Sequence, residues 1–328
     1  VTSDVTSEVT SDVTSEVDNR TLTITALAGN ITVQNLGQDA DALGVIDLNA
    51  DTANFNSTNI DSASIDTASV ELTPLNVNVN VNVGIDTTEL STPGDLIGAH
   101  LLTPTSVSAN VELQDTAIQA LTIDDTVNVD LAGNFETTGN AALTGVTTVQ
   151  GAGSIDAGGT IAMTTTGNVV VSGTVEADDD IDLTNGAGNT IDIDAAITGA
   201  TVDVTSETVK LSSDVAANAG DVNITGNGGA ENIITIDGDS LVASENGNIL
   251  FNGTVAGANS LEANAPGGTV DFNSTVGAGT PLGGLDVHAD DVKLDDSVEV
   301  NGNIDVDADT IELAAAAGGI TTNLDGNL

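Results

Sequence analysis

Carboxylates are by far the most frequent reactive side chains in this sequence, and several are adjacent. A pair of carboxylates can act as the acid and the base of an inverting glycoside hydrolase. Neighbouring acids occur at Asp124/Asp125, Asp178–Asp180, Asp290/Asp291 and Asp295/Asp296. With 50 acidic residues in 328, however, such neighbours are expected by chance.

Basic residues, which polysaccharide lyases usually need as well, are scarce. The candidates are Arg20, Lys210, Lys293, His100 and His288, and none of them lies in a recognisable catalytic motif. Trp and Tyr, which commonly stack on sugars, are absent. The sequence therefore predicts a protein that is not an enzyme, with no catalytic and no cofactor-binding residue.

Calcium is the ligand that so many carboxylates suggest. Asp305, Asp307 and Asp309 resemble the start of an EF-hand loop, but Thr310 and Ala316 stand where that loop needs Gly and Glu. Aligned carboxylates on strands about 4.8 Å apart would nevertheless repel one another. We expect divalent cations, Ca²⁺ in particular, to relieve this repulsion at Asp178, Asp179, Asp180, Asp290, Asp291, Asp295 and Asp296.

The charge balance excludes whole classes of partner. Three basic residues against 50 acids give a net charge of −47. Binding to nucleic acid or to an anionic membrane needs Lys and Arg, so both are excluded. No apolar run is long enough to span a membrane. The sequence contains no Cys, which suits an exported bacterial surface protein.

A short alternating unit must position all of these side chains, and residues 189–211 show it best. Ile191 and Ile193 alternate with Asp192 and Asp194, as the side chains of a half-buried strand do. The unit recurs through much of the sequence, separated by Gly, Ser, Asp or Asn, and no helical pattern intervenes. Repetition of one supersecondary unit is typical of a solenoid. We therefore predict an all-β protein, a right-handed parallel β-helix over residues 18–328 with about 20–25 residues per turn.

Three segments depart from this unit. Residues 1–17 repeat a four-residue Val/Thr/Ser/acid pattern, which is typical either of a spacer or of an edge strand exchanged with a neighbouring subunit. In residues 51–72 the large residues stand five apart, which resembles the pentapeptide-repeat family, although a local variation of a less regular coil fits as well. Pro93 and Pro104 enclose a Leu-rich piece, so a break is expected near 93–104.

Residues 140–328 carry a second resemblance. Phrases such as GNVVVSGTVEADDDIDLTN (167–185) and NGNIDVDADTIELAAAAGGITT (301–322) resemble the β-strand repeats of filamentous-haemagglutinin-type secreted adhesins. That resemblance implies a right-handed parallel β-helix at a bacterial surface. The secretion domain that opens members of the family is not recognisable in this sequence.

Function is predicted by elimination. The ends of a solenoid expose unpaired strand edges, which soluble solenoids usually cap, and neither end of this sequence contains an amphipathic helix. We expect an extracellular structural protein whose copies stack end to end, or exchange strands, into a surface filament or sheath. The alternative is a stalk fragment of a secreted adhesin, and a polysaccharide-degrading enzyme is a third. The expected partners are other copies of the chain and divalent cations.

Overall fold

The computed structural model describes side chains for residues 137, 139–143, 154–226, 233–314 and 319, and elsewhere only the backbone of the strands named below. The chain forms two compact units, residues 1–159 and 160–328. The described part of the chain contains strands and turns but no helix, and so no helix that could cross a membrane.

The first unit is built of short parallel strands, each paired with a strand about one turn further along the chain. Thr21 pairs with Val45, Ile65 with Ile85, and Leu121 with Ala141. Its strands are β1 (Thr2–Ser3), β2 (Ser7–Val13), β3 (Thr21–Ala26), β4 (Asn30–Leu36), β5 (Val45–Asn49), β6 (Thr52–Phe55), β7 (Asn59–Ile60), β8 (Ser64–Asp66), β9 (Ser69–Leu72), β10 (Asn76–Val79), β11 (Val83–Thr92), β12 (Asp95–Gly98), β13 (Leu101–Leu113), β14 (Thr116–Ile118), β15 (Ala120–Asp124), β16 (Asn128–Leu131), β17 (Phe135–Thr137), β18 (Ala141–Val146), β19 (Thr148–Gln150) and β20 (Ile155–Ala157).

The segments that depart from the repeating unit contain strands of this same kind. β1 pairs with β3, and β2 pairs with β4. β12 and β13, on either side of residues 99–100, pair with β10 and β11. Within 51–72, Ala53 pairs with Val70, so that β6, β7 and β8 together make one turn. A square pentapeptide coil would place four strands in that turn.

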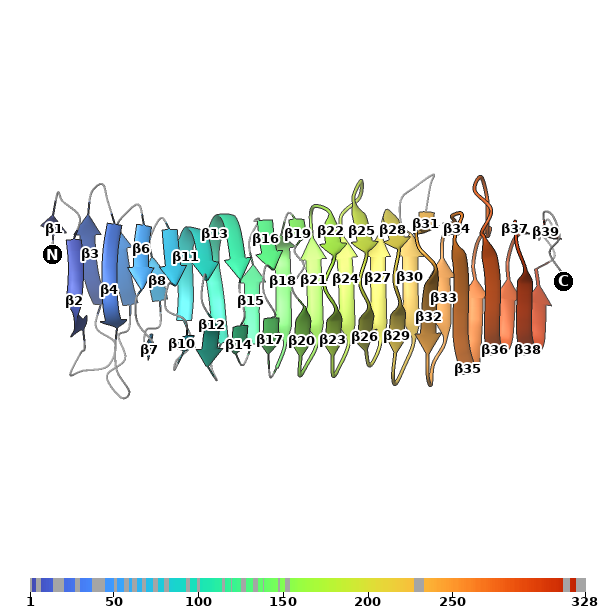
Figure 1. Ribbon diagram of the computed structural model, residues 1–328, viewed down its shortest axis with the longest axis horizontal. Helices are drawn as coiled ribbons and strands as arrows, with labels where there is room; N and C mark the ends of the chain where they lie inside the picture. The colour runs from blue at the N-terminus through green and yellow to red at the C-terminus, as the bar shows by residue number, and fades with distance from the viewer. Residues whose placement is uncertain are drawn as a thin grey trace. The chain divides into compact units, whose positions relative to one another are not determined.

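The second unit stacks its strands in three parallel ladders, and each turn of the chain adds one rung to each ladder. The first ladder contains β21 (Ile161–Thr165), β24 (Ile181–Asn185), β27 (Val202–Ser206), β30 (Val222–Gly226) and β33 (Ile249–Asn252). It continues in the later parts of β35 (Ser260–Phe272), β36 (Gly284–Leu294) and β38 (Ile304–Leu313). Figure 1 shows β21, β24, β27 and β30 side by side.

The other two ladders follow the same order. The second consists of β22 (Val169–Val171), β25 (Thr190–Ile193), β28 (Thr208–Leu211), β31 (Ile233–Ile236) and β34 (Thr254–Ala256), followed by a single bridging residue, Val276, and then β37 (Val298–Val300) and β39 (Ile320–Thr322). The third consists of β23 (Val175–Ala177), β26 (Ile197–Gly199), β29 (Val215–Ala217) and β32 (Ser240–Ser244), then the first parts of β35, β36 and β38.

These ladders form a parallel β-helix of about seven turns, which confirms the predicted fold class. The turn length varies around the predicted value. One turn separates Ile161 from Ile181, Val222 from Ile249, and Val292 from Ile311. Turns therefore take from 19 to 27 residues, because the corners between ladders differ in length.

The core is a column of aliphatic side chains inside the helix. Strand alternation sends every second residue inward. Ile191, Ile193, Val202 and Val204 are fully buried, while Asp192 and Asp203 on the same strands face outward. A fully buried aliphatic side chain contributes roughly 1.5–3 kcal/mol. The alternating unit predicted for residues 189–211 is thus confirmed.

Candidate functional site

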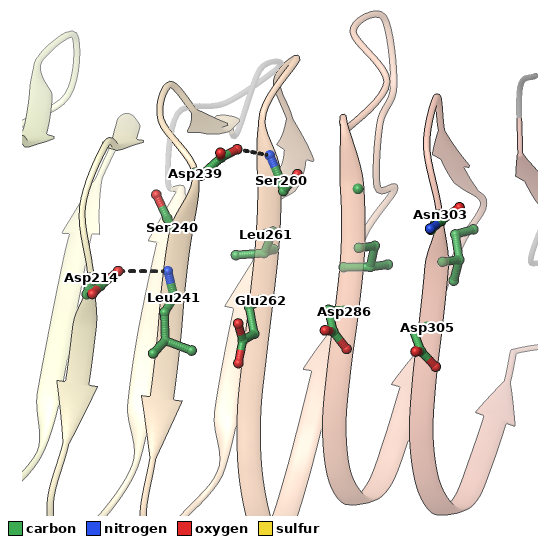
Figure 2. A pocket seen from close by; sticks show the side chains of 13 residues that line it. Asp214, Asp239, Ser240, Leu241, Ser260, Leu261, Glu262, Asp286, Asn303 and Asp305 are labelled. Carbon is green, nitrogen blue, oxygen red and sulfur yellow. Dashed lines mark hydrogen bonds between the residues drawn. The ribbon is translucent and has the colours of Figure 1, made fainter. Parts of the chain in front are cut away.

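The described part of the second unit contains an open groove of about 780 Å³ that crosses the third ladder (Figure 2). Consecutive turns contribute β32, β35, β36 and β38 to it. Leu261, Leu285 and Ile304 line it from the buried side. Its polar lining consists of Asp214, Asp239, Ser240, Ser260, Glu262, Asp286, Asn303 and Asp305.

Three of the groove's carboxylates form a column. Glu262 pairs with Asp286, and Asp286 pairs with Asp305. Each stands next to an inward residue, so alternation turns all three outward, as Figure 2 shows. Neighbouring strands are about 4.8 Å apart, so like charges at this spacing repel one another. The column is a negatively charged strip along the groove.

The other two carboxylates of the groove have a structural role. Asp214 Oδ1 accepts a hydrogen bond from the backbone N–H of Leu241 at 3.1 Å, and Asp239 Oδ1 accepts one from Ser260 N–H at 2.9 Å (Figure 2). The same arrangement recurs where Asp221 accepts from Asn248 N–H at 2.7 Å. Asn168 and Asn248 act in this way on the following turn. Corner Asp and Asn residues thus tie one turn to the next.

This arrangement contains the parts of an anionic surface rather than of an acid–base pair. Glu262, Asp286 and Asp305 stand in one row, on strands that follow one another in the same ladder. An inverting hydrolase instead places its two carboxyl groups on opposite sides of the bond that it cleaves. No Lys, Arg or His is among the residues that line the groove.

The seven residues predicted to bind calcium lie at two different corners. Asp178–Asp180 precede β24, and Asp290 and Asp291 occupy the same corner in β36, with β27, β30, β33 and β35 between them. Asp295 and Asp296 lie at the next corner, where Asp296 Oδ1 accepts a hydrogen bond from Ser297 N–H. Among the described residues, no three His, Asp or Glu side chains converge on one ion. Calcium binding at these positions stays a prediction.

The two lysines lie where the ladders need positive charge. Lys210 pairs with Asp192 on the preceding turn, and Lys210 Nζ lies 3.5 Å from Asp192 Oδ2. Lys293 lies between Asp271 and Glu312 in the first ladder. Asp203, a further outward carboxylate of the first ladder, accepts a hydrogen bond from Asn223 Nδ2 at 2.7 Å. The side chains of Arg20 and His100 lie outside the described residues.

Comparisons with protein-family models, with curated proteins and with solved structures found no match to this chain. The parallel β-helix that the adhesin resemblance implies is present. Neither that family nor the pentapeptide-repeat family gains support from the comparisons.

Three carboxyl groups on the outer faces have a raised pKa. Desolvation against the sheet raises the pKa of Asp182, and the nearby carboxylates of Asp203 and Asp180 add to the effect. Desolvation also raises the pKa of Asp192 and of Asp271, where Lys210 and Lys293 only partly oppose it. In each case the folded state binds a proton more readily than the unfolded chain, whose Asp pKa is near 3.8.

We expect the protein to become more stable as the pH falls from neutral toward 4. Since the folded-state pKa of these carboxyls is raised, the folded chain takes up protons first, and each proton relieves a desolvated or crowded charge. This gain begins as the pH approaches the raised pKa values and is complete near the unfolded value. Thermal unfolding at low ionic strength, followed across this range, measures the effect.

Asp182→Asn isolates one contribution to this pH dependence. Like charges opposite each other on neighbouring strands cost roughly 0.2–1 kcal/mol, so this variant is expected to melt higher at pH 7.5 and to gain less on acidification. Glu245→Gln removes one charge from an exposed turn residue and serves as the control. Equal gains in the two variants would show that net charge, rather than the Asp182–Asp203 contact, sets stability.

Sequence reasoning missed both the groove and its carboxylate column. Glu262 and Asp286 are 24 residues apart, and Asp286 and Asp305 are 19 apart. No fixed period connects them, so only the structure shows that they are neighbours. The one available signal was the alternation itself, which placed each of them on an outer face.

Proposed function

We propose that this chain is a non-enzymatic structural β-helix of the extracellular surface, whose turns continue into further turns to build a filament or sheath. The observation that carries the proposal is the chain's consistent use of its polar residues for stacking. Asp214, Asp221 and Asp239 hold the backbone of the next turn, and Lys210 neutralises an acid on the turn before it. These contacts favour a protein whose role lies in its repeating architecture.

The outer edge of β38 supports assembly by stacking. β38 pairs with β36, and among the described residues no strand pairs with its other side. Ile311 and Leu313 continue the inward column of Val292 and Leu294, yet they are 49% and 53% exposed. A parallel strand added at this edge would bury both side chains. In the filament that strand belongs to another copy, and in an adhesin stalk it belongs to a following turn of a longer chain.

The net charge of −47 sets the conditions for assembly. Two such surfaces repel until salt or divalent cations screen them, since the Debye length falls from about 30 Å at 0.01 M to about 8 Å at 0.15 M ionic strength. We therefore expect the purified chain to be dispersed at low salt and to form fibres when NaCl or CaCl₂ is added. Sedimentation and negative-stain microscopy record both states.

A matched pair of variants tests the edge. Ile311→Asp places a charge on the inward side of β38, whereas Thr310→Asp adds the same charge on the neighbouring outward position. Burial of one aliphatic side chain is worth roughly 1.5–3 kcal/mol, so Ile311→Asp should raise the concentration needed for assembly at least about tenfold. Thr310→Asp should change it much less.

The result can contradict the filament in two ways. A wild-type chain that stays monomeric at high concentration, with salt and calcium present, rules out self-assembly and favours the stalk. Fibres that form equally well in both variants show that assembly uses another surface. Stabilisation by calcium beyond that of NaCl at equal ionic strength would support the calcium prediction separately.

A further inference from the structure

His288 occupies an outward position in the third ladder, surrounded by acids. On β35 its register partner is Asn264, and on β38 its register partner is Asp307. Lys293, the other basic residue of β36, lies beyond the corner in the first ladder. The charged groups around His288 on β35, β36 and β38 are all acidic, namely Glu262, Asp286, Asp290, Asp305, Asp307 and Asp309.

The imidazole of His288 lies between carboxylates of two consecutive turns. His288 Nε2 is 3.1 Å from Asp286 Oδ1 on the same strand, and His288 Nδ1 is 4.0 Å from Asp307 Oδ2 on β38. Asp286 Oδ1 is shielded from solvent and accepts no hydrogen bond. A neutral imidazole has an N–H on one nitrogen only, so it donates to one of these carboxylates at most. An imidazolium has an N–H on both nitrogens and a positive charge.

We propose that His288 is a pH-sensitive latch between β36 and β38. Histidine is the side chain whose charge ordinarily changes between pH 5 and 8. When His288 gains a proton, Nε2–H pairs with Asp286 and Nδ1–H pairs with Asp307, so one cation joins two turns. When it loses the proton, Asp286, Asp305 and Asp307 face each other across the two strands without that cation. Mild acidity therefore tightens the attachment of β38.

Amide hydrogen exchange of the full-length protein tests the latch. The probes are the β38 amides, followed between pH 5.5 and 8 at constant ionic strength and corrected for the intrinsic exchange rate. Because exposed ion pairs are modest, protection of β38 is expected to rise about two- to fivefold as the pH falls through this range. Amides of β27, several turns away, serve as the internal reference and should change much less.

Two variants separate the latch from a general effect of charge. His288→Gln lacks a titrating group and should lose the pH dependence of β38 protection, remaining at the level of the wild type at pH 8. His288→Lys keeps a positive charge throughout and should hold β38 protected at both pH values. A pH dependence in His288→Gln equal to that of the wild type would overturn the proposal, as would unchanged protection in the wild type. Neither outcome depends on whether the chain forms filaments.

Discussion

Replacement of Phe272 by Ala is expected to lower the free energy of unfolding by about 3–5 kcal/mol. Phe251 and Phe272 are the largest fully buried side chains among the described residues. They occupy the same inward position on consecutive turns, and their rings stack with centroids 4.8 Å apart and planes 9° from parallel. Removing one ring opens a cavity in the helix interior and takes a stacking partner from the other.

Leu250→Ala is the matched control, because Leu250 lies next to Phe251 on β33 but faces outward and is only half-buried. Urea unfolding of this variant should shift much less than that of Phe251→Ala or Phe272→Ala. The double variant should lose less than the sum of the two single variants, since a stacked pair is worth about 0.5–1.5 kcal/mol beyond its buried area. Fully additive losses would show that the rings act as independent fillers of the core.

The alternation around these two residues is visible in the sequence, but their stacking is not. Ile249/Phe251 and Val270/Phe272 each read as a strand unit with both side chains inward, and both units are present. Which unit lies on which depends on the length of every corner. These lengths vary, because the turn that follows Val222 takes 27 residues and the turn that follows Val292 takes 19. A strand pattern with period two specifies the face of a residue and leaves its neighbour across the turn open.

The same limit applies to the charged residues. Lys210 and Asp192 are both recognisable as outward residues of adjacent units, yet only the pairing of β25 with β28 brings them to 3.5 Å. His288 gains its second carboxylate from Asp307 on the next turn. Long-range contacts of this kind decide whether an acidic surface repels itself or is neutralised. The sequence predicted the acidic faces, and the register assigns the few cations to particular acids.

The second large effect is expected at Gly277, at the point where the second ladder narrows to Val276 alone. Val276 bridges Val255 on one side and Val298 on the other. Gly277 has a φ of +82°, and its N–H donates to Val255 O at 2.6 Å, so the backbone here is held between two turns. A Cβ at Gly277 would run into the carbonyl oxygen of Glu299. Gly277→Ala is therefore expected to incur both backbone strain and a steric overlap.

Gly279 offers an unusually close control, since it belongs to the same loop and has a φ of +76°, but a Cβ there meets nothing within 4 Å. Gly279→Ala should lose only the roughly 1–2 kcal/mol that a left-handed conformation costs an L-residue. Gly277→Ala should lose a further 1–3 kcal/mol or so, because Glu299 must move and its own N–H bond to Val276 O, 2.8 Å long, is disturbed. Urea midpoints of the two variants give the difference directly. Equal losses would mean that the loop shifts without disturbing the turn beyond it, and that Val276 alone maintains the second ladder at this rung.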